Sequence, residues 1–126
     1  MSWVDDALAS FGRSLGFNDL RFRGQGPVSL EFDRLGTLFF EPQDGHILTY
    51  VVRKLDRPDA EFYARALDIS HWRHHHAFPV SAGLHGETEL TFAVRISESE
   101  FTLPTIERAV DLLGQLHDAV SEGVRA

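Results

Sequence analysis

Three predicted strands, spanning residues 28–54, constrain the fold of this chain more than any other stretch of its sequence. Residues 28–32 alternate apolar and polar side chains, and a period of two predicts a strand with one buried face. Further strands are expected at residues 37–41 and at residues 46 to about 54, because Asp44-Gly45 between them is a strong hairpin signal. Consecutive strands with short turns predict an antiparallel meander.

The second and third of these strands carry more apolar surface than one buried face needs. Phe39-Phe40 and Ile47-Leu48 place apolar side chains at consecutive positions, so both faces of the sheet receive them. We expect one face to present Leu38, Phe40, Leu48, Tyr50 and Val52, and the other to present Phe39, Ile47 and Val51. Either the chain's own second helix or a partner protein covers the surplus, and the sequence leaves both open.

Helical periodicity predicts three helices around the strands. Residues 2–15 carry Val4, Leu8, Phe11 and Leu15 at helical spacing, which makes one apolar stripe. The remaining elements are expected as a helix from Asp56 to about residues 73–76, a hairpin at residues 78–84 and 87–96, and a helix from about Pro104 to about Glu122. The order helix, three strands, helix, two strands, helix predicts a single α+β domain over residues 1–126, with a twisted antiparallel sheet packed against helices.

Composition and charge exclude several classes of function. The chain has 126 residues and no cysteine, so it forms no disulfide and has no thiolate for catalysis or zinc binding. Twelve Lys and Arg against nineteen Asp and Glu give a net charge of −7, which disfavours nucleic acid as a partner. No basic patch followed by an apolar run occurs, so neither a secretory signal nor a membrane span is expected, and we expect a cytoplasmic protein.

Two sequence phrases and the element order identify a family resemblance. Residues 11–17 read Phe-Gly-Arg-Ser-Leu-Gly-Phe, and residues 30–38 read Leu-Glu-Phe-Asp-Arg-Leu-Gly-Thr-Leu, which fits the pattern L-x-F-D-x-x-G-x-L. Residues 103–108, Leu-Pro-Thr-Ile-Glu-Arg, begin the closing helix. In these features the whole chain resembles the class I chaperones of bacterial type III secretion. The histidine-rich residues 71–76 depart from that family's pattern.

The resemblance implies a non-catalytic homodimer without a cofactor. Such a chaperone holds the N-terminal segment of a secreted effector in extended form before export, and the secretion ATPase is a further candidate partner. The side chains expected to form the effector-binding groove are Leu8, Phe11, Leu30, Phe32, Leu38 and Phe40. The side chains expected to form the dimer interface are Phe62, Ala66, Ile69, Trp72, Phe78, Val80, Ala82 and Leu84.

Two alternative functions compete with that of a secretion chaperone. One keeps the chaperone fold but gives it a folded regulatory partner. The other is a small metal-binding protein built on the histidine cluster, because His71 and His75 share one helix face, with Asp68 or His85 as a further ligand. Zinc sites require three or four ligands in fixed geometry, and no spacing here demands them. We therefore favour a polar helix end and predict no metal site. The carboxylates Glu31, Asp33 and Glu41 are not paired in a predicted pocket, so no enzyme is expected.

Overall fold

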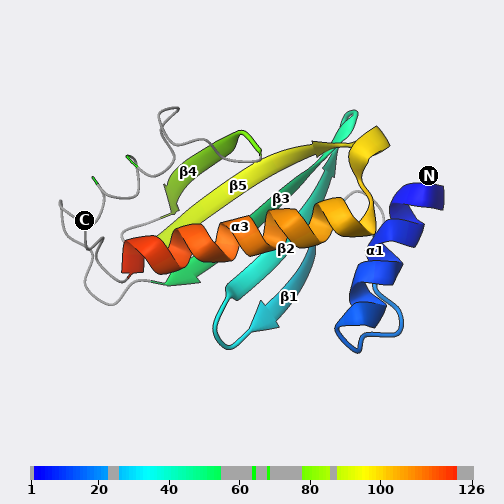
Figure 1. Cartoon of the computed structure of the whole chain (residues 1–126), viewed down its shortest axis with the longest axis horizontal. Helices are drawn as coiled ribbons and strands as arrows, with labels where there is room; N and C mark the ends of the chain where they lie inside the picture. Colours follow the sequence, from blue (N-terminus) through cyan, green and yellow to red (C-terminus); the bar gives the residue numbers. More distant parts are fainter. Residues whose placement is uncertain are drawn as a thin grey trace.

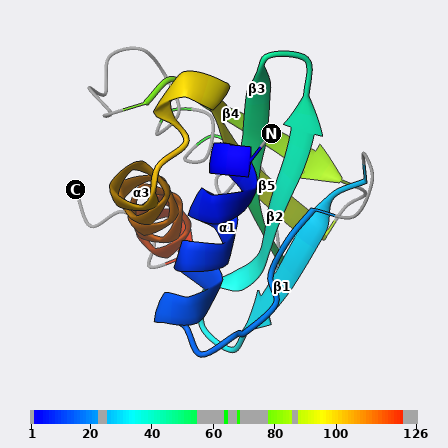
Figure 2. The same ribbon diagram turned by 90° about the vertical axis from the view of Figure 1, so that its right-hand side faces the viewer.

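The computed structural model describes residues 2–22, 26–54, 64, 68, 78–85 and 88–121. Its elements are α1 (Ser2–Ser14), β1 (Val28–Phe32), β2 (Gly36–Gln43), β3 (His46–Lys54), β4 (Val80–His85), β5 (Glu89–Ser97), the short 3₁₀ helix η1 (Glu98–Glu100) and α3 (Leu103–Ser121). The strands form one antiparallel sheet in the order β1-β2-β3-β5-β4. Helices α1 and α3 lie together on one face of that sheet (Figures 1 and 2).

The predicted α+β fold is confirmed over the described residues. The first helix, the three-stranded meander, the second hairpin and the last helix all lie where the sequence patterns placed them, with small shifts at their ends. The predicted second helix falls in a region of which the structure describes two residues, Ala64 and Asp68, both helical. The other residues of that predicted helix lie outside the described part of the chain.

The hydrophobic core lies between the sheet and the two helices. Phe40 is fully buried at its centre, and its ring makes edge-to-face contacts with Phe11 of α1 and with Phe101, at centroid distances of 5.6 and 6.1 Å. Helix α3 contributes a continuous apolar stripe at helical spacing, consisting of Ile106, Ala109, Leu113, Leu116 and Val120. The first helix contributes Val4 and Leu8 to the same core.

The hairpin between β2 and β3 decides which side chains face the core. A two-residue turn at Asp44-Gly45, with Gly45 at φ 80°, pairs Gln43 with His46. Even-numbered positions of β2 therefore lie beside odd-numbered positions of β3. The core face carries Leu38, Phe40, Ile47, Thr49 and Val51, and the opposite face carries Phe39, Leu48, Tyr50 and Val52.

The face assignment predicted for the third strand is therefore wrong. The sequence pattern predicts Leu48, Tyr50 and Val52 on the same sheet face as Leu38 and Phe40. That prediction puts the even-numbered positions of both strands on one face. A two-residue turn forbids that arrangement, because shifting the register of a strand by one residue moves every side chain to the other face. The second face nevertheless receives apolar residues, as predicted.

Gly36 is the glycine of the second sequence phrase, and its position explains why a side chain is excluded there. Its φ is 108°, and a Cβ atom would come within 2.5 Å of the backbone oxygen of Val52. We expect Gly36→Ala to lower the free energy of unfolding by about 2 kcal/mol, from backbone strain and the displaced strand. Urea denaturation followed by circular dichroism measures this loss.

Gly45 supplies the matched control for that prediction. It also has a positive φ, of 80°, but a Cβ atom there would meet nothing within 4 Å. Gly45→Ala should therefore cost only the backbone strain, about 1 kcal/mol. Equal losses in the two variants would show that the contact with Val52 does not matter.

Candidate partner-binding surface

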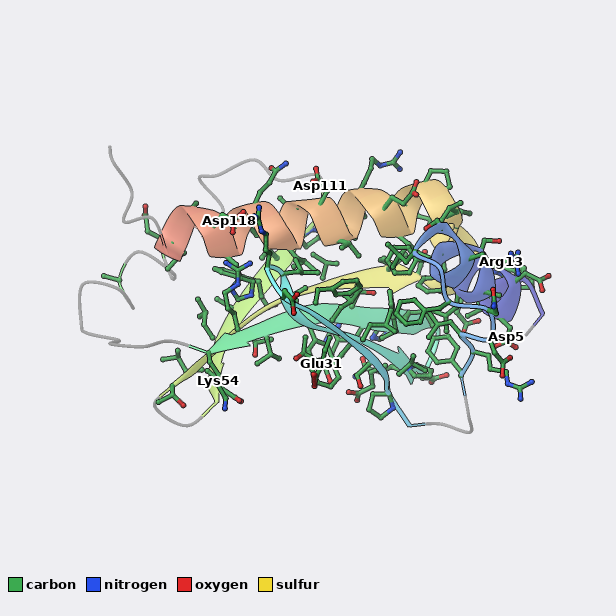
Figure 3. The ribbon with its side chains drawn as sticks, turned by 90° about the horizontal axis from the view of Figure 1, so that it is seen from below. Asp5, Arg13, Glu31, Lys54, Asp111 and Asp118 are labelled. Atoms are coloured by element: carbon green, nitrogen blue, oxygen red, sulfur yellow. The ribbon has the colours of Figure 1, made fainter. Side chains whose placement is uncertain are left out.

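The sheet face opposite α1 and α3 carries no helix of the described residues (Figures 2 and 3). The strand register sets the side chains of this face in rows across β1, β2, β3 and β5. The central row is Ser29, Phe39, Tyr50 and Ala93, and the rows on either side are Glu31, Thr37, Val52 and Thr91, and Glu41, Leu48 and Arg95. We call these side chains the open face. It combines an aromatic centre with polar and charged surroundings.

An aromatic pair forms the centre of the open face. The rings of Phe39 and Tyr50 stack with centroids 4.8 Å apart and planes 11° from parallel. The Tyr50 hydroxyl donates a hydrogen bond to Glu41 Oε1 at 3.1 Å. Burial, and then the hydrogen bond and charge of Glu41, raise the pKa of Tyr50 to about 12, so the phenol stays neutral at physiological pH. The pair is consequently held in one orientation.

Two carboxylates, Glu31 and Glu41, give a negative charge to the part of the open face formed by β1, β2 and β3. The first cation that these three strands place on this face is Lys54, at the end of β3. Glu31 is exposed and Glu41 is partly buried, and neither forms an ion pair within the described part of the chain. The cations of this face lie farther away, with Lys54 at the end of β3 and Arg95 on β5. In Figure 3, Glu31 lies on the side of the sheet away from α3.

The six predicted groove residues do not lie on this face. The structure places five of them in the core, with exposed fractions between 0% and 8%: Leu8, Phe11, Leu30, Leu38 and Phe40. Phe32 is partly buried and packs against the same core. In the single chain, a groove is therefore not open at these positions, because their side chains pack together in the core between the sheet and the two helices. An apolar stripe reads the same in a sequence whether a helix or a partner covers it.

The predicted dimer residues fall into two groups. Phe62, Ala66, Ile69 and Trp72 lie outside the described residues. Phe78, Val80 and Ala82 are partly buried against the core, while Leu84 on the edge strand β4 is 50% exposed. The structure thus leaves one predicted interface side chain clearly accessible, on a strand whose outer edge has no neighbour in the described sheet.

Helix α1 and the residues directly after it present exposed apolar side chains that were not among the predicted groove residues, and one of them is Leu15, which was expected on the apolar stripe of residues 2–15. Trp3 is 54% exposed, and Leu15 and Phe17 are each 42% exposed. The indole nitrogen of Trp3 donates a hydrogen bond to the backbone oxygen of Glu98 at 2.9 Å, which fixes the ring near η1. Trp3 lies one position before the core residue Val4, so it is about 100° away from Val4 around the helix. This offset from the buried stripe is the sequence signal that Trp3 is exposed.

A buried polar contact that no sequence pattern indicated joins α3 to the sheet. His117 is 1% exposed, its Nε2–H donates to the backbone oxygen of Val51 at 2.8 Å, and its ring packs edge-on against Phe92. Burial, as the main cause, lowers the pKa of His117 to about 4. Nearby, Arg53 donates to the backbone oxygen of Leu35 and to Asp118. These contacts fix α3 on β3.

The histidine cluster at residues 71–76 lies outside the described residues. Among the residues that the structure does describe, no group of three or more His, Asp or Glu side chains is placed to hold a metal ion. No helix in the described ranges is long and apolar enough to cross a membrane.

The arrangement of helices α1 and α3 on one face of a five-stranded antiparallel sheet is also found in a solved type III secretion chaperone and in a solved chaperone–effector complex. The SycH chaperone of Yersinia pestis, solved with a stable fragment of YscM2, superposes with a TM-score of 0.69 over 94% of this chain and 98% of that one, at 11% identity. The ExsC–ExsE complex gives a TM-score of 0.74 at 20% identity, covering 95% and 92% of the two chains. The chaperone–effector complex HopA1–SchA gives 0.65 at 19% identity, covering 98% and 94%.

Residues 3–121 match the family model of the type III secretory system chaperone SycN, and the chain belongs to that family. The chaperone protein SycN of Yersinia enterocolitica is 28% identical over 125 residues, which cover 95% of this chain and 98% of the relative. The SycN protein of Yersinia pseudotuberculosis shows the same identity and coverage. The resemblance identified from the sequence phrases is thereby confirmed.

Proposed function

We propose that this chaperone binds an N-terminal segment of an exported protein in extended form and keeps it competent for secretion, without a catalytic step. The observation that carries the proposal is the open face: a sheet with an aromatic centre that no helix of the described residues covers. A partly exposed aromatic centre without a covering helix in the described part of the chain is characteristic of a surface that a partner occupies. Membership of the SycN family and the likeness to chaperones solved with partners support it.

An extended segment has two ways to use this fold. It can add a strand to the sheet edge at β1, where backbone hydrogen bonds bind without reading the sequence. It can also place its side chains on neighbouring apolar surface, such as the exposed Trp3, Leu15 and Phe17 on and beside α1. The segment loses conformational entropy when it binds, so it must bury a large area in compensation. The proposed site of action is the bacterial cytoplasm, before export, where the secretion ATPase is a further proposed partner.

We further propose that two copies of the chain form the working unit. Leu84 is half exposed on edge strand β4, and an uncovered apolar edge is an aggregation hazard that a two-fold interface removes. The residues proposed for this interface include Phe78, Val80, Ala82 and Leu84, together with Phe62, Ala66, Ile69 and Trp72 from outside the described part of the chain.

Co-expression with the products of neighbouring genes tests the function and the oligomeric state together. We expect one product to be soluble only with the chaperone, and light scattering of the purified complex to give two chaperone chains to one client. Limited proteolysis followed by mass spectrometry should protect an N-terminal segment of that client. A complex with a folded client and no protected segment would instead favour a regulatory binding protein, and a single chaperone chain per complex would exclude the dimer.

A further inference from the structure

We infer that the open face recognises a cationic side chain of the client, an arginine or lysine held over the Phe39–Tyr50 pair between Glu31 and Glu41. The inference rests on the proposed function and names the chemistry of the segment that this face accepts. It is carried by three observations on the described residues: the stacked aromatic pair, the placement of two carboxylates beside it, and the absence of an ion pair at either carboxylate within that part of the chain.

The strand register places the two carboxylates on opposite sides of Phe39. Ser29 lies directly across from Phe39 on β1, and Glu31 is two residues farther along that strand, so it is the diagonal neighbour of the ring. Glu41 is two residues along β2 from Phe39 on the same face, and it already accepts the hydrogen bond of Tyr50. A guanidinium or ammonium group above the rings is therefore within reach of both carboxylates.

The surroundings of the pair fit the rest of a long cationic side chain. Ser29 and Thr37 are small, so they leave room beside Phe39. Leu48 and Val52 flank Tyr50 along β3 and offer apolar surface to a methylene chain. A cation within about 6 Å of an aromatic centroid is attracted by the face of the ring, and a partly desolvated site strengthens this attraction. The carboxylates add attraction that does not depend on the ring.

Charge complementarity identifies a client segment rather than a second copy of the chain as the occupant. Each chain has a net charge of −7. The part of the open face beside Phe39 carries two carboxylates, and the first cation that β1, β2 and β3 place on this face is Lys54 at the end of β3. Two such faces would bring four carboxylates together, and like charges at an interface are unfavourable. An extended segment with alternating side chains can instead place one cation on this face.

The test uses overlapping peptides tiled across the N-terminal region of the client recovered by co-expression. Their affinities for the full chaperone are measured by fluorescence anisotropy, with Glu31→Gln/Glu41→Gln as the variant and Glu107→Gln as the matched control. Glu107 is an exposed carboxylate on α3, the helix on the opposite side of the sheet. We expect the double variant to bind the best peptide about tenfold more weakly and the control to bind it normally. Replacing the peptide's arginine or lysine by methionine should remove the difference between the two proteins.

Three outcomes would overturn this inference, and each is distinguishable from failure of the proposed function, which is described first. If no peptide binds the unmodified chaperone, the proposed function itself fails. If peptides bind equally well to the double variant, the client is recognised without this cation site. If the double variant loses stability but no affinity, the carboxylates serve a cation of the chain itself. If it changes the oligomeric state alone, a second copy occupies the face.

Discussion

Phe40→Ala is expected to lower the free energy of unfolding by about 3–5 kcal/mol, the cost of deleting a large aromatic side chain from a packed core. Phe40 is 0% exposed and lies between the rings of Phe11 and Phe101. The variant leaves a cavity that α1 and the sheet cannot close without moving. Because small domains are stable by only about 5–15 kcal/mol, a large share of the chaperone should then be unfolded at moderate urea concentrations.

Phe39, the preceding residue, provides the matched control. It points to the open face, where it is partly buried and stacked on Tyr50. Phe39→Ala should cost about 1 kcal/mol of stability, since it removes one aromatic contact and little buried area. Client binding by this folded variant should be weakened. Urea denaturation of both variants, followed by circular dichroism, measures the contrast, and equal stability losses would contradict the assignment of the two faces.

Acidification from pH 7 to pH 4 is expected to remove about 3 kcal/mol of stability through His117 alone. Burial lowers the pKa of this side chain to about 4 from an ordinary value of 6.5. Between these two values the unfolded chain binds a proton that the folded chain does not, so stability falls as the pH falls through this window. The proton would have to enter a site where Nε2–H is bonded to the backbone oxygen of Val51 and the ring is packed against Phe92.

The variant His117→Gln separates this effect from the titration of the carboxylates. Its amide NH₂ can still donate to the backbone of Val51, but it does not bind a proton in this range. The unfolding free energy of the variant should therefore depend less steeply on pH between 6.5 and 4, whatever its value at pH 7. Chemical denaturation at a series of pH values gives both slopes, and parallel curves would show that His117 does not titrate on unfolding.

Local sequence patterns were sufficient for most of the elements. The helical stripe of residues 2–15 and the alternation in residues 28–32 each report which side of a local element is buried, and both elements are present. Asp44-Gly45 located the hairpin, because a two-residue turn with positive φ depends on those residue types. The phrase containing Gly36 indicated the family, and its glycine is required by the close approach of Val52.

The residues of the candidate partner-binding surface could not be predicted from such local patterns. Leu38 and Phe40 were expected to line a groove, yet α1 and α3 cover them. The open face instead carries Phe39 and Tyr50. Glu31 comes to Phe39 from the neighbouring strand β1, and Tyr50 of β3 bonds to Glu41 of β2, so both pairings join different strands. No local pattern reports such a pairing. His117 was missed for the same reason, because its partner Val51 is 66 residues away in the chain.

The sequence by itself determined where the helices, strands and turns of the described residues lie, since each depends on periodicity and turn chemistry within a few residues. Only the tertiary structure decided which apolar side chains are core and which are available to a partner. The physical reason is that burial is a property of the packed molecule: Phe39 and Phe40 are chemically identical neighbours, and only the packing of α1 and α3 on one face of the sheet distinguishes them.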